Sequence, residues 1–525
     1  MILKRIIRSI LTVSIFTFFS KITGLARDVL IAKTIGANHI SDSFWIAFRV
    51  PNMLRKIFAE GSFSQAFIPI LNNIHNNDCS NYHKTRSLIN KTVIVLTLSV
   101  SVIAMIGILT SPLIIKTIAS GICNSTDNIE QFKCTVSMTR IMFPYIVLIS
   151  LTSFASSILN TWKIFSIPAF TPALLNISMI FSCIFLSKYL QQPVLSLSIG
   201  VILGGIIQLI IQWIAIIKIG FAPKWSTNFM ESWNDKDVQK IIKKMIPAII
   251  GMTISQVSLL INTNIATWLK HGSLTWLTFA DRIMELPVSL LGMALSTVML
   301  PELSKTFATK NTIQYNKLLN NGLKLVIIFG IPSAICMATF PTGLVATLFH
   351  FGAFNNIDVN QTKYAVMAYS LGVIGLMSSK LLSSAFYAMQ DTITPTKIFL
   401  FGLVISQIVN FIAVPIYSHI GLALGISMGA LTNSLLMLTI LIKRNFFDYK
   451  NNNWGKFLLK IIPASIVVAI IFNYFDNRID WIGLQTHFIY RFIIFIHIIL
   501  LAMLSYLMVL FLFGMRPNNF TKTQT

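Results

Sequence analysis

Charged residues are scarce in this chain of 525 residues: only 11% are Asp, Glu, Lys or Arg, while 55% are hydrophobic. A soluble protein carries roughly 25% charged residues, so the composition argues against a soluble enzyme. The apolar residues gather in runs of about 20, the length that a helix needs to cross a bilayer. We therefore predict an all-α polytopic membrane protein with about 14 transmembrane helices.

Among the charged residues, acidic ones are the minority. The chain has 17 Asp and Glu and 41 Lys and Arg, which gives a formal net charge of +24. With a cytoplasmic N-terminus, most basic residues outside the spans fall in cytoplasmic loops, densest over 218–244, 305–324 and 443–460. This is the positive-inside bias, and such loops suit anionic membrane lipids. No soluble domain accompanies the charge, so nucleic-acid binding is not expected. A cleavable signal peptide is not expected either.

Metal and cofactor motifs are missing. The five cysteines form no CxxC or Cys/His spacing. No Gly-rich phosphate loop, Ser/His/Asp set or nucleophilic Cys with a partner His occurs, so we expect a transporter without cofactor or metal rather than an enzyme. Cys123 and Cys134 share a loop on the predicted outer side. A disulfide between them stays open, with two free thiols as the favoured state.

What is present is a series of apolar spans with short polar loops. The spans are predicted at 10–35, 40–71, 88–118, 136–160, 168–190, 194–217, 240–268, 273–300, 316–348, 360–388, 394–416, 421–442, 456–475 and 485–513. The longest polar connection, 220–240, contains Trp225 and Trp233 and is typical of an amphipathic interfacial segment. It lies near the middle of the chain, where two duplicated halves would join.

A weak internal repeat supports a duplication. The segment Ala66-Phe67-Ile68-Pro69 is similar to Val298-Met299-Leu300-Pro301, and Ser156-Ser157 and Ser383-Ser384 each precede a proline at the same distance. Six spans return the chain to its starting side, as in transporters with parallel repeats. We predict an N-terminal six-helix lobe over 1–218, a cytoplasmic interfacial linker over 219–239, a C-terminal six-helix lobe over 240–443 and two extra helices over 444–525.

The most informative residues are charges inside the spans. Each charge at the bilayer centre costs about 2.5–3.5 kcal/mol on insertion scales, so it persists only where it faces protein, water or a charged ligand. The candidates are Lys21, Arg27, Asp28, Asp42, Arg49, Arg55, Asp281, Arg282 and Glu285. Helical spacing places the first three on one face and the last three on another. Pro51 and Pro287 remove helical hydrogen bonds beside them. If the repeat is real, the second charged turn faces the first.

Two interpretations of these charges stay open. They are internal ion pairs that only fix helix packing, or they bind an anionic substrate. Arginine binds phosphate in bidentate fashion, and we favour that function for Arg27, Arg55 and Arg282. Lys56 and Glu60 lie near the membrane boundary, where pairing or snorkelling explains them.

Weaker candidates are polar residues in other spans. Asn160, Asn176, Asn262, Asn264 and Asn410 are interpreted as interhelical hydrogen-bonding residues. Lys380, Asp391 and Asn410 form either an ion or proton site or, as we favour, simple pairs and helix caps.

The charged stretches resemble those of the MurJ/MviN family of lipid II flippases. The run from Ser20 to Asp28 resembles the family opening S-R-x-x-G-x-x-R-D, and the run from Pro51 to Phe63, followed by Ala66-Phe67-Ile68-Pro69, resembles its most specific signature. Ala280 to Pro287 is similar to A-D-R-x-x-E-x-P, and Leu159 to Lys163 and Ile167 to Phe170 also match. One departure is Lys21, where the family usually has arginine.

This resemblance implies the fold of the multidrug/oligosaccharidyl-lipid/polysaccharide exporters, with two lobes around a central cationic cavity and a groove for a polyprenyl tail on the last two helices. It implies a flippase of the bacterial inner membrane that moves the undecaprenyl-pyrophosphate-linked disaccharide-pentapeptide of peptidoglycan synthesis by alternating access. The implied substrate contacts are Lys21, Arg27, Arg49, Arg55 and Arg282, and the cavity carboxylates are Asp28, Asp42, Asp281 and Glu285. Partners from the wall-synthesis or division machinery are compatible with this function.

Other functions predict other features. An exporter of another polyprenyl-linked oligosaccharide or of a drug is the nearest alternative, but a pocket for cationic drugs needs carboxylates rather than arginines. A membrane-embedded transferase needs paired carboxylates on an exposed loop for a metal-diphosphate, and none is found. A non-transporting cell-wall scaffold needs no buried arginines.

Overall fold

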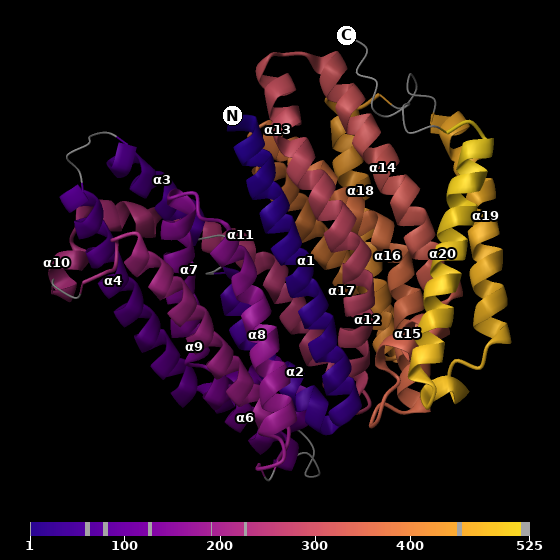
Figure 1. Ribbon diagram of the computed structural model, residues 1–525, viewed down its shortest axis with the longest axis horizontal. Coiled ribbons are helices and arrows are strands. Elements are labelled where there is room, and N and C mark those ends of the chain that lie inside the picture. Colours follow the sequence, from indigo (N-terminus) through magenta and orange to yellow (C-terminus); the bar gives the residue numbers. More distant parts are fainter. Residues whose placement is uncertain are drawn as a thin grey trace. The chain divides into compact units, whose positions relative to one another are not determined.

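The computed structural model describes residues 2–57, 63–76, 82–123, 129–190, 192–224, 228–448 and 454–515. Every regular element within them is a helix (Figure 1), which confirms the predicted fold class. The first half contains α1 (Ile2–Thr34), α2 (His39–Ile57), α3 (Phe63–Asn76), α4 (Tyr82–Leu109), α5 (Ser111–Ile118), η2 (Ser120–Cys123), α6 (Ile129–Met142), α7 (Tyr145–Thr161), α8 (Ser166–Phe185), α9 (Leu195–Lys218), α10 (Phe229–Trp233) and α11 (Lys236–Ala266).

The second half continues the series. It contains α12 (Ser273–Pro287), η4 (Val288–Met293), α13 (Ala294–Ala308), α14 (Thr312–Thr339), α15 (Pro341–Phe349), α16 (Asn356–Ala388), α17 (Ile393–Tyr417), α18 (His419–Lys443), α19 (Trp454–Arg478), η5 (Gly483–Gln485) and α20 (Phe488–Leu512). The element η4 is a π-helix, while η2 and η5 are 3₁₀ turns.

Each predicted span coincides with one helix or with two consecutive ones. Ten segments of the described residues are long and apolar enough to cross a membrane. The other predicted spans correspond to α1, α2 with α3, α11, and α12 with α13. Because α2 carries four charges and α12 ends at Pro287 after 15 residues, neither forms a long apolar segment. All nine candidate charges lie on α1, α2 and α12.

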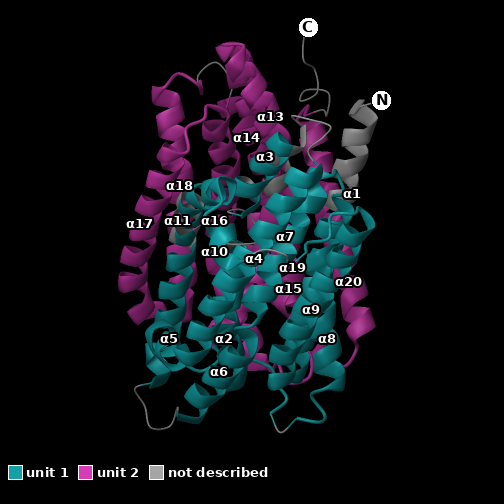
Figure 2. Cartoon of the chain, turned by 90° about the vertical axis from the view of Figure 1, so that its left-hand side faces the viewer, with its two compact units in different colours: residues 1–272 teal, residues 273–525 magenta. Residues whose placement is uncertain are grey.

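The chain forms two compact units, Met1–Gly272 and Ser273–Thr525 (Figure 2). The same packing order recurs in each. In the first unit α3 packs on α7, α7 on α9 and α8 on α9, and in the second α13 packs on α16, α16 on α18 and α17 on α18. The helix α11 packs on α2, α3, α4 and α5 of the first unit. The predicted lobe boundaries stay a prediction.

One interhelical contact recurs at matching positions. In the first unit the hydroxyls of Ser64 on α3 and Ser157 on α7 form a hydrogen bond of 2.8 Å. In the second unit Ser296 on α13 bonds Ser384 on α16. Each α3 or α13 serine stands five residues before the proline of the repeated segment. The sequence similarity therefore coincides with a similar side-chain contact inside each unit.

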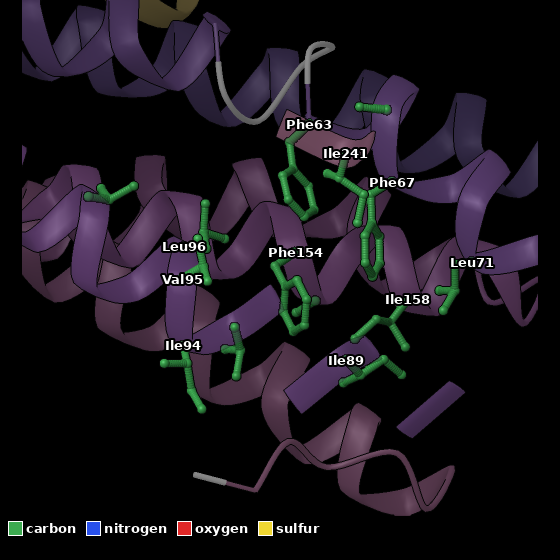
Figure 3. Close-up of a cluster of buried hydrophobic side chains, with 14 of the residues drawn as sticks. Phe63, Phe67, Leu71, Ile89, Ile94, Val95, Leu96, Phe154, Ile158 and Ile241 are labelled. Atoms are coloured by element: carbon green, nitrogen blue, oxygen red, sulfur yellow. The ribbon is translucent and has the colours of Figure 1, made fainter. Parts of the chain in front are cut away.

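A buried cluster of aromatic and aliphatic side chains packs within the first unit (Figure 3). Phe63 and Phe67 of α3 pack on Phe154 of α7, with ring centroids 6.0 and 5.4 Å apart. Ile89 of α4 and Ile241 of α11 belong to the same cluster. Burying a side chain of this size contributes about 1.5–3 kcal/mol, so the cluster fixes the positions of α3 and α7.

Exposed apolar residues lie on α10, within the predicted interfacial linker. Phe229, Met230 and Trp233 are exposed there, while Trp225 lies outside the described residues. The interfacial role of this linker stays a prediction. Cys123 and Cys134 are free thiols. Glu60 also lies outside the described residues.

Candidate functional site

The first group of charges lies on α1, where Arg27 and Asp28 are 5% and 0% exposed. The guanidinium of Arg27 donates to Asp28 Oδ1 through Nε at 2.9 Å and Nη2 at 2.6 Å. Its Nη1 donates to Asn176 Oδ1 of α8 at 2.9 Å. Burying an isolated ion costs several kcal/mol, and this pairing offsets that cost. The result is an arginine fixed in one orientation.

Asn176 joins the two helices that hold this arginine. Its amide nitrogen donates to the Ser20 carbonyl of α1 at 3.1 Å, which confirms the predicted interhelical role. Gly24 faces this asparagine, and a Cβ there would lie 3.4 Å from Asn176 Nδ2, an ordinary contact distance, so the approach of the two helices does not depend on glycine. Lys21 is half-buried on the same helix, less than two turns before Arg27.

The second group lies on α2, which runs without interruption through Pro51. Asp42 is 7% exposed, and its Oδ2 accepts a hydrogen bond of 2.6 Å from the backbone amide of Gly272. Arg55, at the other end of α2, donates through Nε and Nη2 to Asn52 Oδ1 at 3.2 and 3.1 Å. Arg49 lies between them and is half-buried. The α2 arginines are thus presented from one rigid helix.

The segment 267–272, which follows α11, makes several further contacts. Thr267 Oγ1 accepts from the Gly121 amide at 3.1 Å, and Trp268 Nε1 donates to Ser120 Oγ at 3.0 Å. The rings of His39 and His271 lie 6.0 Å apart. Asp42 therefore contributes a charged acceptor to a network that joins the end of α11 to η2 and to the start of α2.

The third group lies on α12 in the second unit. Arg282 Nη1 donates to Glu285 Oε2 at 3.0 Å, and their side chains are 31% and 38% exposed. Asp281 is half-buried beside them. Phe279 on the preceding turn is fully buried and stacks on Phe349. Pro287 ends α12, and the π-helix η4 follows at once. Such π-segments are frequent at functional sites.

The structure brings together some of the predicted charges and gives others unexpected partners. Arg27 pairs with Asp28 and Arg282 with Glu285, while Asp42 binds a backbone amide. Sequence reasoning missed Asn52 and Gly272 as partners. Asn52 carried a local signal, since it lies three residues before Arg55 on a helix. Gly272 carried none, since its backbone binds Asp42 from 230 residues away.

The weaker candidates resolve into structural roles where contacts are seen. Asp391 Oδ2 accepts from Arg444 at 2.7 Å and from the Thr394 hydroxyl at 2.7 Å, and its Oδ1 accepts from the Thr394 amide. Asn264 donates to the Thr117 carbonyl of α5, an interhelical bond as predicted. Pairing and capping therefore explain Asp391. Among the described residues no group of three His, Cys, Asp or Glu could hold a metal ion.

The comparisons with known proteins give matches over nearly the whole chain. Residues 31–513 match the family model described as "Lipid II flippase MurJ". The chain is 40% identical to the lipid II flippase MurJ of Burkholderia cenocepacia over 479 residues, 91% of this chain and 92% of that protein. It is 36% identical to the probable lipid II flippase MurJ of Buchnera aphidicola subsp. Baizongia pistaciae over 518 residues, 98% of each.

Solved structures show the same similarity. A lipid II flippase MurJ in an inward closed conformation matches with a TM-score of 0.78 and 27% identity, covering 95% of this chain and 97% of that one. An inward-facing multidrug transporter of the MATE family matches with a TM-score of 0.66 and 13% identity, covering 81% and 94%. The second likeness concerns the fold alone.

Proposed function

Since the chain belongs to the MurJ family of lipid II flippases, we propose that it moves lipid II across the membrane through a cavity built around the charges of α1, α2 and α12. It is a transporter and not an enzyme. Its substrate is the undecaprenyl-pyrophosphate-linked precursor of peptidoglycan, and alternating access is the transport mechanism that the fold supports.

The buried Arg27 is the observation that best supports this cavity. Placing a guanidinium inside the membrane costs free energy. An ion pair with Asp28 does not by itself explain why the chain has a guanidinium there. Arg27 is held by Asp28 and Asn176 in a fixed orientation, as expected of a residue preorganised for a ligand. A diphosphate offers oxygens that match the planar donors of arginine.

Each of the cationic residues has a role in this proposal. Arg27, Arg55 and Arg282, with Lys21 and Arg49, hold the diphosphate while the polyprenyl tail stays in the membrane. Binding one anion by cations from α1, α2 and α12 favours closure of the inner side. A hydrogen bond to a charged group contributes about 1.5–3 kcal/mol, so a few such contacts suffice to shift a conformational equilibrium.

The carboxylates let the empty carrier reset. In the structure Asp28 binds Arg27 and Glu285 binds Arg282. The diphosphate competes with them, and they take the arginines back after release. Asp281 supports the same turn of α12. Asp42 acts differently, because its bond to Gly272 holds the connection between α11 and α12 in place.

Orientation and environment complete the proposal. The N-terminus lies in the cytoplasm, so that the basic loops follow the positive-inside rule, and the protein resides in the bacterial inner membrane. The membrane potential, worth about 2.3 kcal/mol per charge per 100 mV, is large enough to drive the reset. Wall-synthesis or division proteins are partners to be sought.

The experiment is complementation of a bacterium depleted of its own lipid II flippase. The wild-type chain is compared with Arg27→Ala, Arg55→Ala and Arg282→Ala, and with Arg478→Ala as a control arginine exposed at the end of α19. Membrane levels are checked by immunoblotting. The proposal expects growth with the wild type and the control only. Growth with all three cavity variants at normal levels overturns it.

A further inference from the structure

The short helix α15 is held at both of its ends by charges of the C-terminal helix pair. We propose that Asp476 of α19 and Arg491 of α20 form a clamp on α15 that makes the pair move as one body with the second unit during transport. Both are positioning residues. This inference rests on the proposed function, because it concerns a pair that meets the lipid tail of the substrate.

The first half of the clamp is at the N-terminus of α15. This helix begins at Pro341 and has no side-chain cap of its own. Asp476 Oδ1 accepts a hydrogen bond of 2.8 Å from the Gly343 amide, 133 residues away in the chain. A helix N-terminus leaves its first amides without partners, so a carboxylate from α19 supplies the missing acceptor.

The second half is at the C-terminus of α15, which ends before His350. Arg491 is fully buried, and its Nη2 donates to the His350 carbonyl at 3.0 Å. Nη1 lies 3.5 Å from both His350 Nδ1 and the Trp481 carbonyl. The guanidinium carbon lies 5.0 Å from the centre of the Phe351 ring. Arg491 therefore binds the end of α15 through hydrogen bonds and a cation–π contact.

The signs of the two charges match the helix that they hold. A helix dipole places partial positive charge at the N-terminus and partial negative charge at the C-terminus. The carboxylate of Asp476 lies at the positive N-terminus of α15, and the guanidinium of Arg491 lies at its negative C-terminus. Reversing either charge would repel the helix end that it meets. This agreement at both ends distinguishes a clamp from an incidental polar contact.

Aromatic packing keeps the clamp rigid. Phe340, which precedes α15, stacks on Phe472 of α19 with centroids 5.4 Å apart and on Phe495 of α20 at 5.9 Å. Trp481, between the two helices, is 1% exposed and meets Phe340 edge-on at 5.2 Å. Asp476 and Arg491 thus lie next to the packed connection between α19 and α20. These two helices run side by side (Figure 1).

The consequence concerns the lipid tail. Leu459, Ile462, Ile466 and Ile470 form an exposed apolar stripe along α19, and Ile489, Leu504 and Met508 are exposed on α20. A pair with such faces contacts lipid tails along its length. If the clamp is lost, packing and the bond from Tyr506 to the Ile328 carbonyl still hold the pair on α14. The pair then follows the second unit less closely, and a substrate with a long tail is affected more than one with a short tail.

The test combines hydrogen exchange with transport by the full-length protein in liposomes. The variants are Asp476→Ala, which removes the acceptor of the Gly343 amide, and Arg491→Met, with Arg491→Lys in case the methionine variant does not accumulate. Asp480→Ala and Arg478→Met are matched controls, because both residues are exposed in the same hairpin and Asp480 accepts from the Gly483 amide rather than from α15. Transport is measured with lipid II and with an analogue that has a short prenyl tail.

We expect the amides of α15 to exchange at least about fivefold faster in both clamp variants, since a lost cap is worth about 1 kcal/mol, and not in the controls. Transport of lipid II should fall while that of the short-tailed analogue persists. Unchanged exchange, or an equal fall for both lipids, overturns the clamp. If the wild type moves neither lipid, the proposed function fails, and the exchange rates still decide whether the clamp exists.

Discussion

Asp42 Oδ2 and the backbone nitrogen of Gly272 lie 2.6 Å apart, in a hydrogen bond that joins α2 to the last residue of the first unit. Charged acceptors strengthen such a bond by about 1 kcal/mol over neutral ones. Gly272 has a φ of +90°, a conformation that glycine adopts without strain. This bond therefore holds the backbone at Gly272 against α2.

We predict that Asp42→Asn loosens this connection and impairs transport. Asparagine keeps the acceptor oxygen but loses its charge, so the segment 267–272 should open about fivefold more often. Hydrogen exchange of a peptide that covers this segment measures the change, and complementation measures transport. Glu130→Gln, on the exposed first turn of α6, is the control. Unchanged exchange together with full complementation would show that Asp42 has no such role.

Lys21→Arg is predicted to keep or improve transport, whereas Lys21→Ala abolishes it. Lysine provides the positive charge without the bidentate fork that arginine would add. The initial rate of lipid II transport in liposomes is the measurement. Loss of transport with arginine would mean that this half-buried site requires the smaller ammonium group.

Each serine pair is predicted to contribute about 1 kcal/mol of coupling between its two helices. Ser64→Ala, Ser157→Ala and the double variant form the cycle, and thermal unfolding in detergent reports their stability. Ser43→Ala is the control, because Ser43 bonds only the His39 carbonyl of its own helix in the contacts seen. The double variant should be about as stable as the worse single variant. Additive losses would contradict a direct interaction.

Asp391 is predicted to stabilise the protein in a pH-dependent manner. Burial raises the pKa of this carboxyl, but hydrogen bonds from Thr394 and Arg444 outweigh it and lower the pKa to about 2. Since the pKa in the folded state is depressed, the stabilisation is present above the ordinary value of 3.8 and is lost as the pH falls toward 2. Because Arg444 is 41% exposed, screening reduces the contribution to about 1 kcal/mol.

Asp391→Asn should therefore lower the thermal stability at pH 7, and the difference from the wild type should shrink as the pH falls below 3.8 and nearly vanish at about pH 2. Thermal unfolding in detergent across this range provides the measurement. Arg444→Gln should produce a smaller loss of the same sign. A difference between Asp391→Asn and the wild type that persists at pH 2 would assign the loss to packing instead of charge.

The helices and the charged positions were predictable from the sequence, because both depend on local composition. A run of apolar residues fixes a span, and a charge within it stands out, as Arg27 and Arg282 do. The Arg282–Glu285 pair also follows from helical spacing. These features require no knowledge of which helices are neighbours.

The partners of the charges were less predictable. Asn176 binds Arg27 from 149 residues away, and several asparagines in the spans were equal candidates for such a role. The acceptor role of Asp42 was hidden because backbone amides carry no sequence signal. The clamp on α15 was missed for the same reason, since Asp476 and Arg491 bind the backbone of Gly343 and His350.

The most direct test of the cationic cavity is the transport of labelled lipid II by the purified protein in liposomes. Arg27→Ala is compared with the wild type at equal protein content, with Arg478→Ala as the control. Our account predicts transport by the wild type and the control and at least a hundredfold slower transport by Arg27→Ala, as losing two or more charge-assisted contacts implies. Equal rates for all three proteins would contradict the account.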